Sequence, residues 1–168
     1  SPSSGYSHAP WGAANGYEGN SNDWYLCQSG PKYRQGIQQV VTDLAKQYGL
    51  AFFKFDGFCP SCEAEGHGHL PGPYAVEANT DAYLELLTAV RQTRRDIFLD
   101  PTCGMWLSPW WLKYVDSIWG SVSDDYPDII APGPIVRDSA TTTRDAVFRQ
   151  RCREHSGYPP AAIEHLGI

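Results

Sequence analysis

The chain of 168 residues lacks any apolar run of about 18 residues, so no segment is long enough to cross a membrane as a helix. It also lacks a basic stripe, and its formal net charge is −6, so nucleic acid is not an expected partner. Glycine-rich phosphate-binding motifs are missing as well. The cysteines number five, and an odd count does not describe a complete set of disulfides, so the compartment stays open.

Methionine is scarce, since Met105 is the only one and the chain begins with Ser1. The chain opens on a loop-like segment and stops in an apolar run, so we expect it to be an internal piece of a longer protein. Apolar residues make up 42% of the chain, enough for one domain with a core. Aromatic residues are frequent at 13%, which suits flat sugar-stacking surfaces as well as ordinary core packing.

Residues 50–56 predict a short strand that ends at a functional site. The run is apolar, rich in aromatics and free of Pro and Gly, which predicts a buried strand. Lys54 and Asp56 are two residues apart and share one face, while Phe53 and Phe55 take the other. Opposite charges at the carboxyl end of a parallel strand indicate a ligand site, although a structural ion pair gives the same pattern.

Helices and strands alternate along the rest of the chain. Residues 1–30 predict a long loop with aromatic side chains. The expected elements after it are a helix from Pro31 to about 48, strand 50–56, a helix from Asn79 or Thr80 to about 95, strand 96–100, a short helix from Pro109, strand 117–119, a helix over about 144–155 and a strand from 161. This alternation predicts a parallel α/β architecture, and the chain is long enough for about half of a (β/α)8 barrel.

Apolar residues at helical spacing predict one buried face on each of the first two helices. These residues are Ile37, Val40, Val41, Leu44 and Tyr48 in the first, and Ala82, Tyr83, Leu86, Leu87 and Val90 in the second.

Four sulfur and imidazole side chains lie close together in the loop over 57–78. They are Cys59, Cys62, His67 and His69. Such ligands can bind zinc. However, the spacing is tighter than in common zinc fingers, and the His-x-His pair would have to turn back on itself. A local disulfide or two free thiols on an ordered loop is the preferred interpretation.

Acidic and aromatic residues gather where predicted strands end. Asp56, Asp124 and Asp125 all follow strands, and in a parallel sheet these ends share one rim. Glycosidases need two carboxylates that flank the bond, although solvated acids that cap turns give the same pattern. Trp106 and Trp119 also lie beside strand ends and are candidates for stacking on a sugar ring.

Several segments, in order, resemble the α-galactosidase-like (melibiase-type) glycoside hydrolases, the clan of families 27, 31 and 36, and family 36 most of all. The segment from Phe53 to Gly57 resembles the Lys-x-Asp nucleophile strand of that clan. The segments Ser108–Leu112, Asp116–Trp119 and Ser123–Asp124 resemble the region that leads to the acid/base, and the beginning of the chain, Thr143–Asp145 and His165–Ile168 are also similar.

The resemblance implies that residues 1–168 are a fragment of a single catalytic domain, a partial (β/α)8 TIM barrel from about strand three or four to the start of strand seven. It implies retaining hydrolysis of terminal α-linked galactose-type sugars through a covalent glycosyl-enzyme, with no cofactor and no metal. Asp56 would be the nucleophile and Asp124 the acid/base, and the neighbouring Asp125 competes for the second role.

The resemblance also implies that Lys54 holds sugar hydroxyls. Together with Trp106, Trp119, Asp125 and Arg144 it is expected to bind the substrate, an α-galactoside oligosaccharide or glycan. The Cys/His loop is not part of the common nucleophile motif, so the substrate within the clan stays open. Two alternatives remain: an inactive or sugar-binding barrel protein, and a metal-dependent barrel lyase or isomerase. Half a barrel leaves strand edges open, so the fragment can itself be inactive. The sequence does not predict the oligomeric state.

Overall fold

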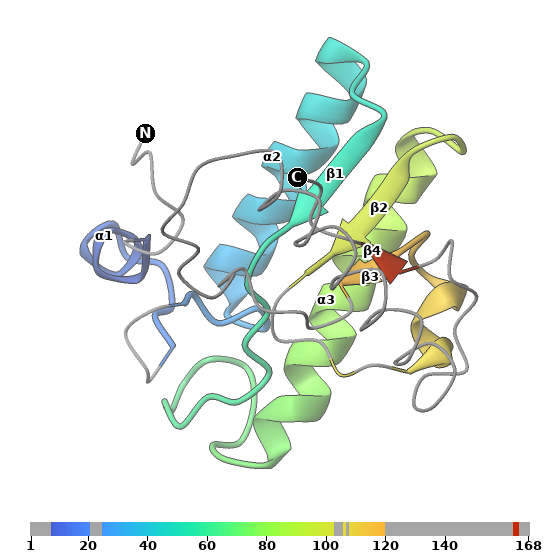
Figure 1. Cartoon of the computed structure of the whole chain (residues 1–168). Helices are drawn as coiled ribbons and strands as arrows, with labels where there is room; N and C mark the ends of the chain where they lie inside the picture. The colour runs from blue at the N-terminus through green and yellow to red at the C-terminus, as the bar shows by residue number, and fades with distance from the viewer. Residues whose placement is uncertain (1–7, 21–24, 103–105, 107, 120–162, 165–168) are drawn as a thin grey trace, which may run out of the picture.

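The computed structural model describes residues 8–20, 25–102, 106, 108–119 and 163–164 (Figure 1). The elements in chain order are α1 (His8–Ala14), α2 (Pro31–Tyr48), β1 (Phe52–Phe55), α3 (Tyr74–Thr93), β2 (Phe98–Pro101), the 3-10 helix η2 (Pro109–Lys113), β3 (Ile118–Trp119) and β4 (Ile163–Glu164). In the described part of the chain, every helix is too short or too polar to span a membrane.

The strands pair in parallel, as the alternation of elements predicts. β1 pairs with β2, with Phe52 opposite Phe98 and Lys54 opposite Asp100. β3 pairs with β4 in the same sense. The segment before β3 joins β2, because the backbone N–H of Asp116 donates to the carbonyl oxygen of Leu99 at 3.0 Å. The parallel α/β architecture is therefore confirmed for these strand pairs, and the partial barrel stays a prediction.

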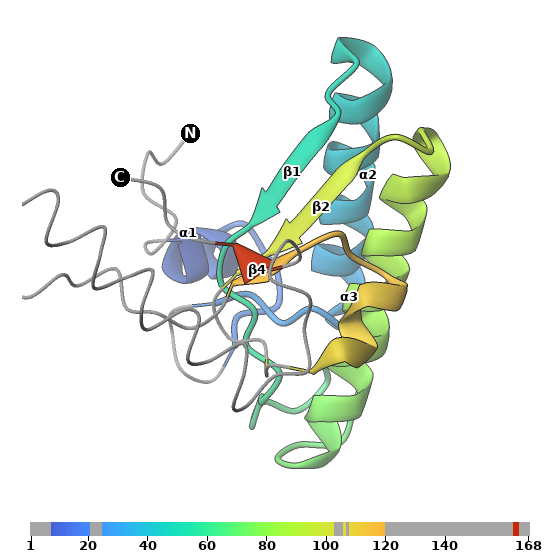
Figure 2. The same cartoon turned by 45° about the vertical axis from the view of Figure 1, so that its right-hand side comes forward.

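Helices α2 and α3 lie side by side and cover one face of β1 and β2 (Figure 2). The core between the helices and the sheet is made of aliphatic and aromatic side chains. Its largest members are Phe58, Tyr83, Leu86, Leu87, Ile97, Leu99, Trp111 and Ile118. All five residues of the predicted stripe on α3 are buried, which confirms that prediction. The hydroxyl of Tyr83 is enclosed, and burial, followed by the nearby charge of Asp100, raises its pKa.

The predicted buried face of α2 is right for Val41 and for Ile37, which packs against the core, and wrong for Val40, Leu44 and Tyr48. Val41 and Ala45 are buried, whereas Val40 is 55% exposed and Tyr48 is 71% exposed. The small side chain of Ala45 lets a neighbouring element pack closely against α2. The prediction followed the large apolar side chains and therefore left Ala45 out of the buried face. The end of α2 follows expectation, because Gly49 adopts the left-handed conformation that terminates helices.

The N-terminal segment and the start of α3 also differ from expectation. The segment predicted as a continuous loop contains α1. α3 begins at Tyr74, directly after Pro73, instead of at a cap on Asn79 or Thr80. Proline suits the first turn of a helix, where its missing N–H costs nothing. Asn79 is consequently an interior helix residue, fully buried against the N-terminal segment.

β1 is covered on one face, so the prediction of a buried strand is wrong in part. Phe53 and Phe55 pack against the core, and Phe55 meets the ring of Tyr83 edge-on with centroids 6.0 Å apart. Phe52 and Lys54 are exposed on the opposite face. The division of side chains between the two faces of β1 is as predicted.

Candidate functional site

Asp56 lies just beyond the carboxyl end of β1 and is exposed. Its Oδ1 atom accepts a hydrogen bond from Oγ1 of Thr102 at 2.9 Å. Thr102 is buried at the end of β2, and its backbone N–H donates to the carbonyl oxygen of Phe55 at 2.8 Å. The two strand ends therefore hold one oxygen of the carboxylate, and the described residues provide no hydrogen-bond partner for the other.

The chain turns directly after Asp56, as expected for a glycine at this position. Gly57 has a φ of +82°, which a residue with a Cβ rarely adopts. A Cβ there would lie 2.6 Å from the ring of Tyr25. The turn therefore depends on glycine for both its backbone conformation and the space beside Tyr25.

Asp100 is a buried acid that sequence reasoning missed. It lies opposite Lys54 in the parallel register and is 1% exposed. The hydroxyl of Ser117 donates to its Oδ1 atom at 2.6 Å. Both strands carry a charged residue near the carboxyl end, and residues opposite each other in a parallel pair lie on the same sheet face, so Lys54 and Asp100 share a face.

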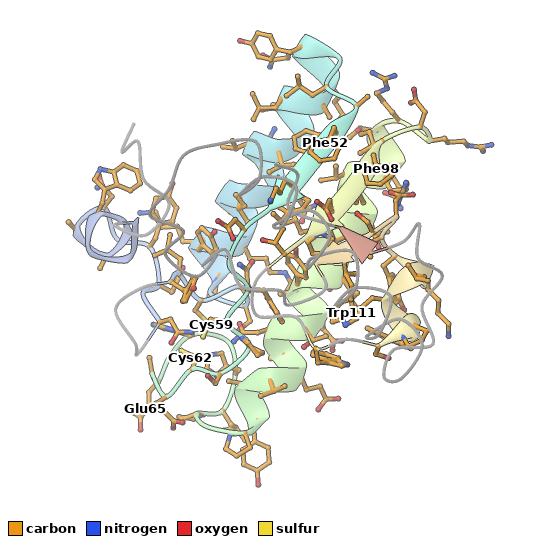
Figure 3. All side chains as sticks on the ribbon, viewed as in Figure 1. Phe52, Cys59, Cys62, Glu65, Phe98 and Trp111 are labelled. Carbon is orange, nitrogen blue, oxygen red and sulfur yellow. The ribbon has the colours of Figure 1, made fainter. Side chains whose placement is uncertain are left out.

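Of the two tryptophans predicted to stack on a sugar ring, the structure describes the side chain of Trp106 only. Trp106 is 45% exposed, and its ring stacks on that of Trp110 with centroids 6.4 Å apart. Trp111 behind them is fully buried in the core. Trp119 belongs to β3, and its side chain lies outside the described residues. At the other end of the sheet, Phe52 and Phe98 stack at 5.7 Å on the exposed face (Figure 3).

The second half of the predicted site lies outside the described residues. This holds for Asp124, Asp125 and Arg144, and also for the predicted helix at 144–155. The approach of Asp124 to Asp56 therefore stays a prediction.

The cysteine–histidine group of the structure differs from the predicted one in a single residue, because Cys27 takes the place of Cys59. The structure brings together Cys27, Cys62, His67 and His69, whose ligand atoms all lie within 4.8 Å of one another. Cys59 is outside this group, and its sulfur contacts the carbonyl oxygen of Ser61 at 3.5 Å.

Of the two alternatives for Cys59 and Cys62, a local disulfide or two free thiols, the structure has the free thiols. Cys27 comes from the predicted N-terminal loop, far earlier in the chain, so local spacing gave no signal for it.

A scan against models of protein families and searches of curated proteins and of solved structures found no match for this chain.

Proposed function

We propose that the chain carries the nucleophile of a retaining glycoside hydrolase that acts on α-linked galactose-type sugars, with Asp56 as the nucleophile. The observation that supports this most directly is the hydrogen bond between Thr102 and Asp56. It fixes an exposed carboxylate at the carboxyl ends of two parallel strands, the place where α/β enzymes bind their ligands.

In this proposal, one oxygen of Asp56 attacks the anomeric carbon and forms an ester bond while the bond to the leaving oxygen breaks. A second acid, Asp124 or Asp125, donates a proton to that oxygen. The same group then takes a proton from water as the water oxygen attacks the anomeric carbon, the bond between that carbon and Asp56 breaks, and the sugar leaves with its original configuration. Lys54, two residues before Asp56 and exposed in β1, would donate hydrogen bonds to sugar hydroxyls.

The test uses the full-length protein and an α-galactose-configured cyclitol aziridine, which labels retaining nucleophiles covalently. Digestion and mass spectrometry should locate the label on Asp56. The variant Asp56→Asn should take no label and lose hydrolysis of an aryl α-galactoside. The control Asp81→Asn makes the same chemical change on the exposed side of α3, and it should behave like the wild type.

Two results would reject the proposal. Turnover that persists in Asp56→Asn would remove Asp56 as the nucleophile. A protein that binds galactosides but neither hydrolyses them nor takes the label would be the sugar-binding alternative.

A further inference from the structure

Two buried thiols and two imidazoles converge beyond the carboxyl end of β1. Cys27 and Cys62 are both fully buried, while His67 and His69 are partly exposed. The sulfur of Cys27 lies 3.3 Å from Nε2 of His69, and the sulfur of Cys62 lies 3.6 Å from Nδ1 of His67. We propose that Cys27, Cys62, His67 and His69 form a structural zinc site.

The distances suit one tetrahedral ion. With Zn–S near 2.3 Å and Zn–N near 2.0–2.1 Å, tetrahedral angles separate a sulfur from a nitrogen by about 3.5 Å and two sulfurs by about 3.8 Å. The two sulfur–nitrogen distances, 3.3 and 3.6 Å, agree with this value. The four atoms lie within 4.8 Å of one another, so the widest pair needs to close by about 1–1.5 Å at most for an ion.

The orientation of His69 is a second, independent feature of a metal ligand. Its Nδ1 lies 2.8 Å from the carbonyl oxygen of Leu70. A carbonyl can only accept, so Nδ1 carries the proton and the lone pair is on Nε2, the atom that faces Cys27. Histidine ligands of metals commonly have their other nitrogen held in this way by a backbone carbonyl.

The backbone allows the His-x-His pair to turn back on itself. Gly68, between the two histidines, has a φ of +82°. A Cβ there would lie 3.0 Å from the carbonyl oxygen of Ser29, so the loop also packs closely against the segment that carries Cys27. The two rings lie 6.1 Å apart at 86° to each other, so both nitrogens can face the thiols.

The site would connect two loops that are distant in sequence. Cys27 lies in the N-terminal segment, where its N–H donates to the carbonyl oxygen of Glu18 at 2.8 Å. Cys62 begins a loop that closes at Gly72, whose N–H donates to the carbonyl oxygen of Cys62 at 3.0 Å. Figure 3 shows Cys62 on this loop, beside the neighbouring Cys59.

Asn79 in α3 hydrogen-bonds to both of these loops. Its Oδ1 atom accepts from the thiol of Cys27 at 3.2 Å and from the backbone N–H of Ser29 at 2.9 Å, while Nδ2 donates to the carbonyl oxygen of Pro60 at 2.8 Å. Zinc would replace the thiol proton of Cys27. Four protein ligands complete a tetrahedral shell and leave no position for a substrate, so the inferred role is structural.

The main experiment measures zinc in the full-length protein, purified without added chelator, by elemental mass spectrometry. We expect one zinc per chain in the wild type and in Cys59→Ser, the matched control from the same loop. In Cys27→Ser and His69→Gln, zinc affinity should fall by more than about 100-fold, since losing an outer-shell partner alone costs about 10–100-fold. Replacing zinc by cobalt should give tetrahedral absorption bands with thiolate charge transfer, changed by Cys27→Ser and not by Cys59→Ser.

Other outcomes would overturn the inference, even where a cysteine variant fails to fold. A wild-type protein without stoichiometric zinc that also fails to bind added zinc tightly has no such site. A disulfide between Cys27 and Cys62, seen by thiol counting and intact mass, would explain the pair instead. Loss of activity on zinc removal with an unchanged melting temperature would make the ion catalytic. Zinc content, cobalt absorption and thiol counting do not depend on glycosidase activity, so failure in these three measurements is separate from failure of the proposed function.

Discussion

Glu18 supplies the N-terminal cap of α2 from outside the helix. The N-cap residue, Gly30, has no side chain for this purpose, and Pro31 follows it. Instead, Oε1 of Glu18 accepts from the backbone N–H of Lys32 at 3.0 Å, and Oε2 accepts from that of Tyr33 at 2.9 Å. Two N–H groups that the helix leaves unpaired are thus satisfied by one carboxylate at the positive end of the helix dipole.

The change Glu18→Gln keeps the shape of the side chain but removes its charge and one acceptor. Loss of a helix cap costs about 0.5–2 kcal/mol, and a charge at the helix N-terminus contributes about 0.3–1 kcal/mol. Glu18 is partly exposed, so solvent screens its charge, and Gln retains one acceptor. We therefore expect the free energy of unfolding to fall by about 1 kcal/mol at pH 7.

The cost of Glu18→Gln should depend on pH. Partial burial raises the pKa of Glu18, but the N–H donors of Lys32 and Tyr33 and the nearby His67 outweigh this and lower it overall. A carboxylate with a lowered pKa stabilises the fold above its unfolded pKa, and this contribution is lost as the pH falls through the folded pKa. The difference between wild type and variant should therefore be full at pH 7 and shrink below about pH 4.

Urea unfolding at pH 7 and at about pH 3 measures both effects. The control is Glu65→Gln in the exposed loop before α3, where the carboxylate makes no hydrogen bond or ion pair with the described residues; it should change stability little at either pH (Figure 3). A Glu18→Gln variant as stable as the wild type at pH 7 would refute the cap. A loss that is equal at both pH values would refute the role of its charge.

Gly30 offers an independent check on the cap. Its φ of −58° suits any residue, but an added Cβ would lie 2.5 Å from Cβ of Glu18 and 2.8 Å from its Oε2 atom. Gly30→Ala should therefore displace the carboxylate and cost about as much as Glu18→Gln. Because both changes remove the same contact, the double variant should lose less than the sum of the two, and strict additivity would argue against a shared mechanism.

Two further variants test how the loops and strands are held. Asn79→Ala leaves the buried N–H of Ser29 and the partly buried carbonyl oxygen of Pro60 without this partner, so it should cost about 1–3 kcal/mol for the buried group in urea unfolding, and a near-neutral result would contradict its role. Asp116→Asn removes the charge that pairs with Arg91 at 2.8 Å but keeps an acceptor for the N–H of Leu99, so it should cost about 1 kcal/mol or less, with the loss reduced in high salt.

Sequence periodicity predicted most of the element order because local patterns determined it. The stripe on α3 and the terminating Gly49 followed from spacing and backbone preference alone. The buried side of α2 did not, because it depends on which neighbour packs there and on the small Ala45. The start of α3 was also misplaced, because an asparagine with capping chemistry is used for a buried tertiary contact.

The candidate site residues likewise fall into those that local sequence spacing predicts and those that only tertiary packing brings together. The spacing of two predicts that Lys54 and Asp56 share one face; the structure places Lys54 in β1 and Asp56 just beyond its end, and both are exposed. The thiol of Cys27 could not be assigned to the group of Cys62, His67 and His69 from the sequence, because it meets them only through tertiary packing. Cys59 matched the local ligand spacing better, yet its side chain lies outside the cluster.

The exposed side of β1 has a consequence for shortened versions of the chain. β1 is hydrogen-bonded to β2 along one edge, and a shortened chain that keeps only these two strands would leave the opposite edge of β1 uncovered, able to pair with an extended segment of a second molecule. The stacked rings of Phe52 and Phe98 add an apolar surface nearby, with Lys54 as the only charge within the strand. Truncated material limited to these elements should therefore self-associate as its concentration rises.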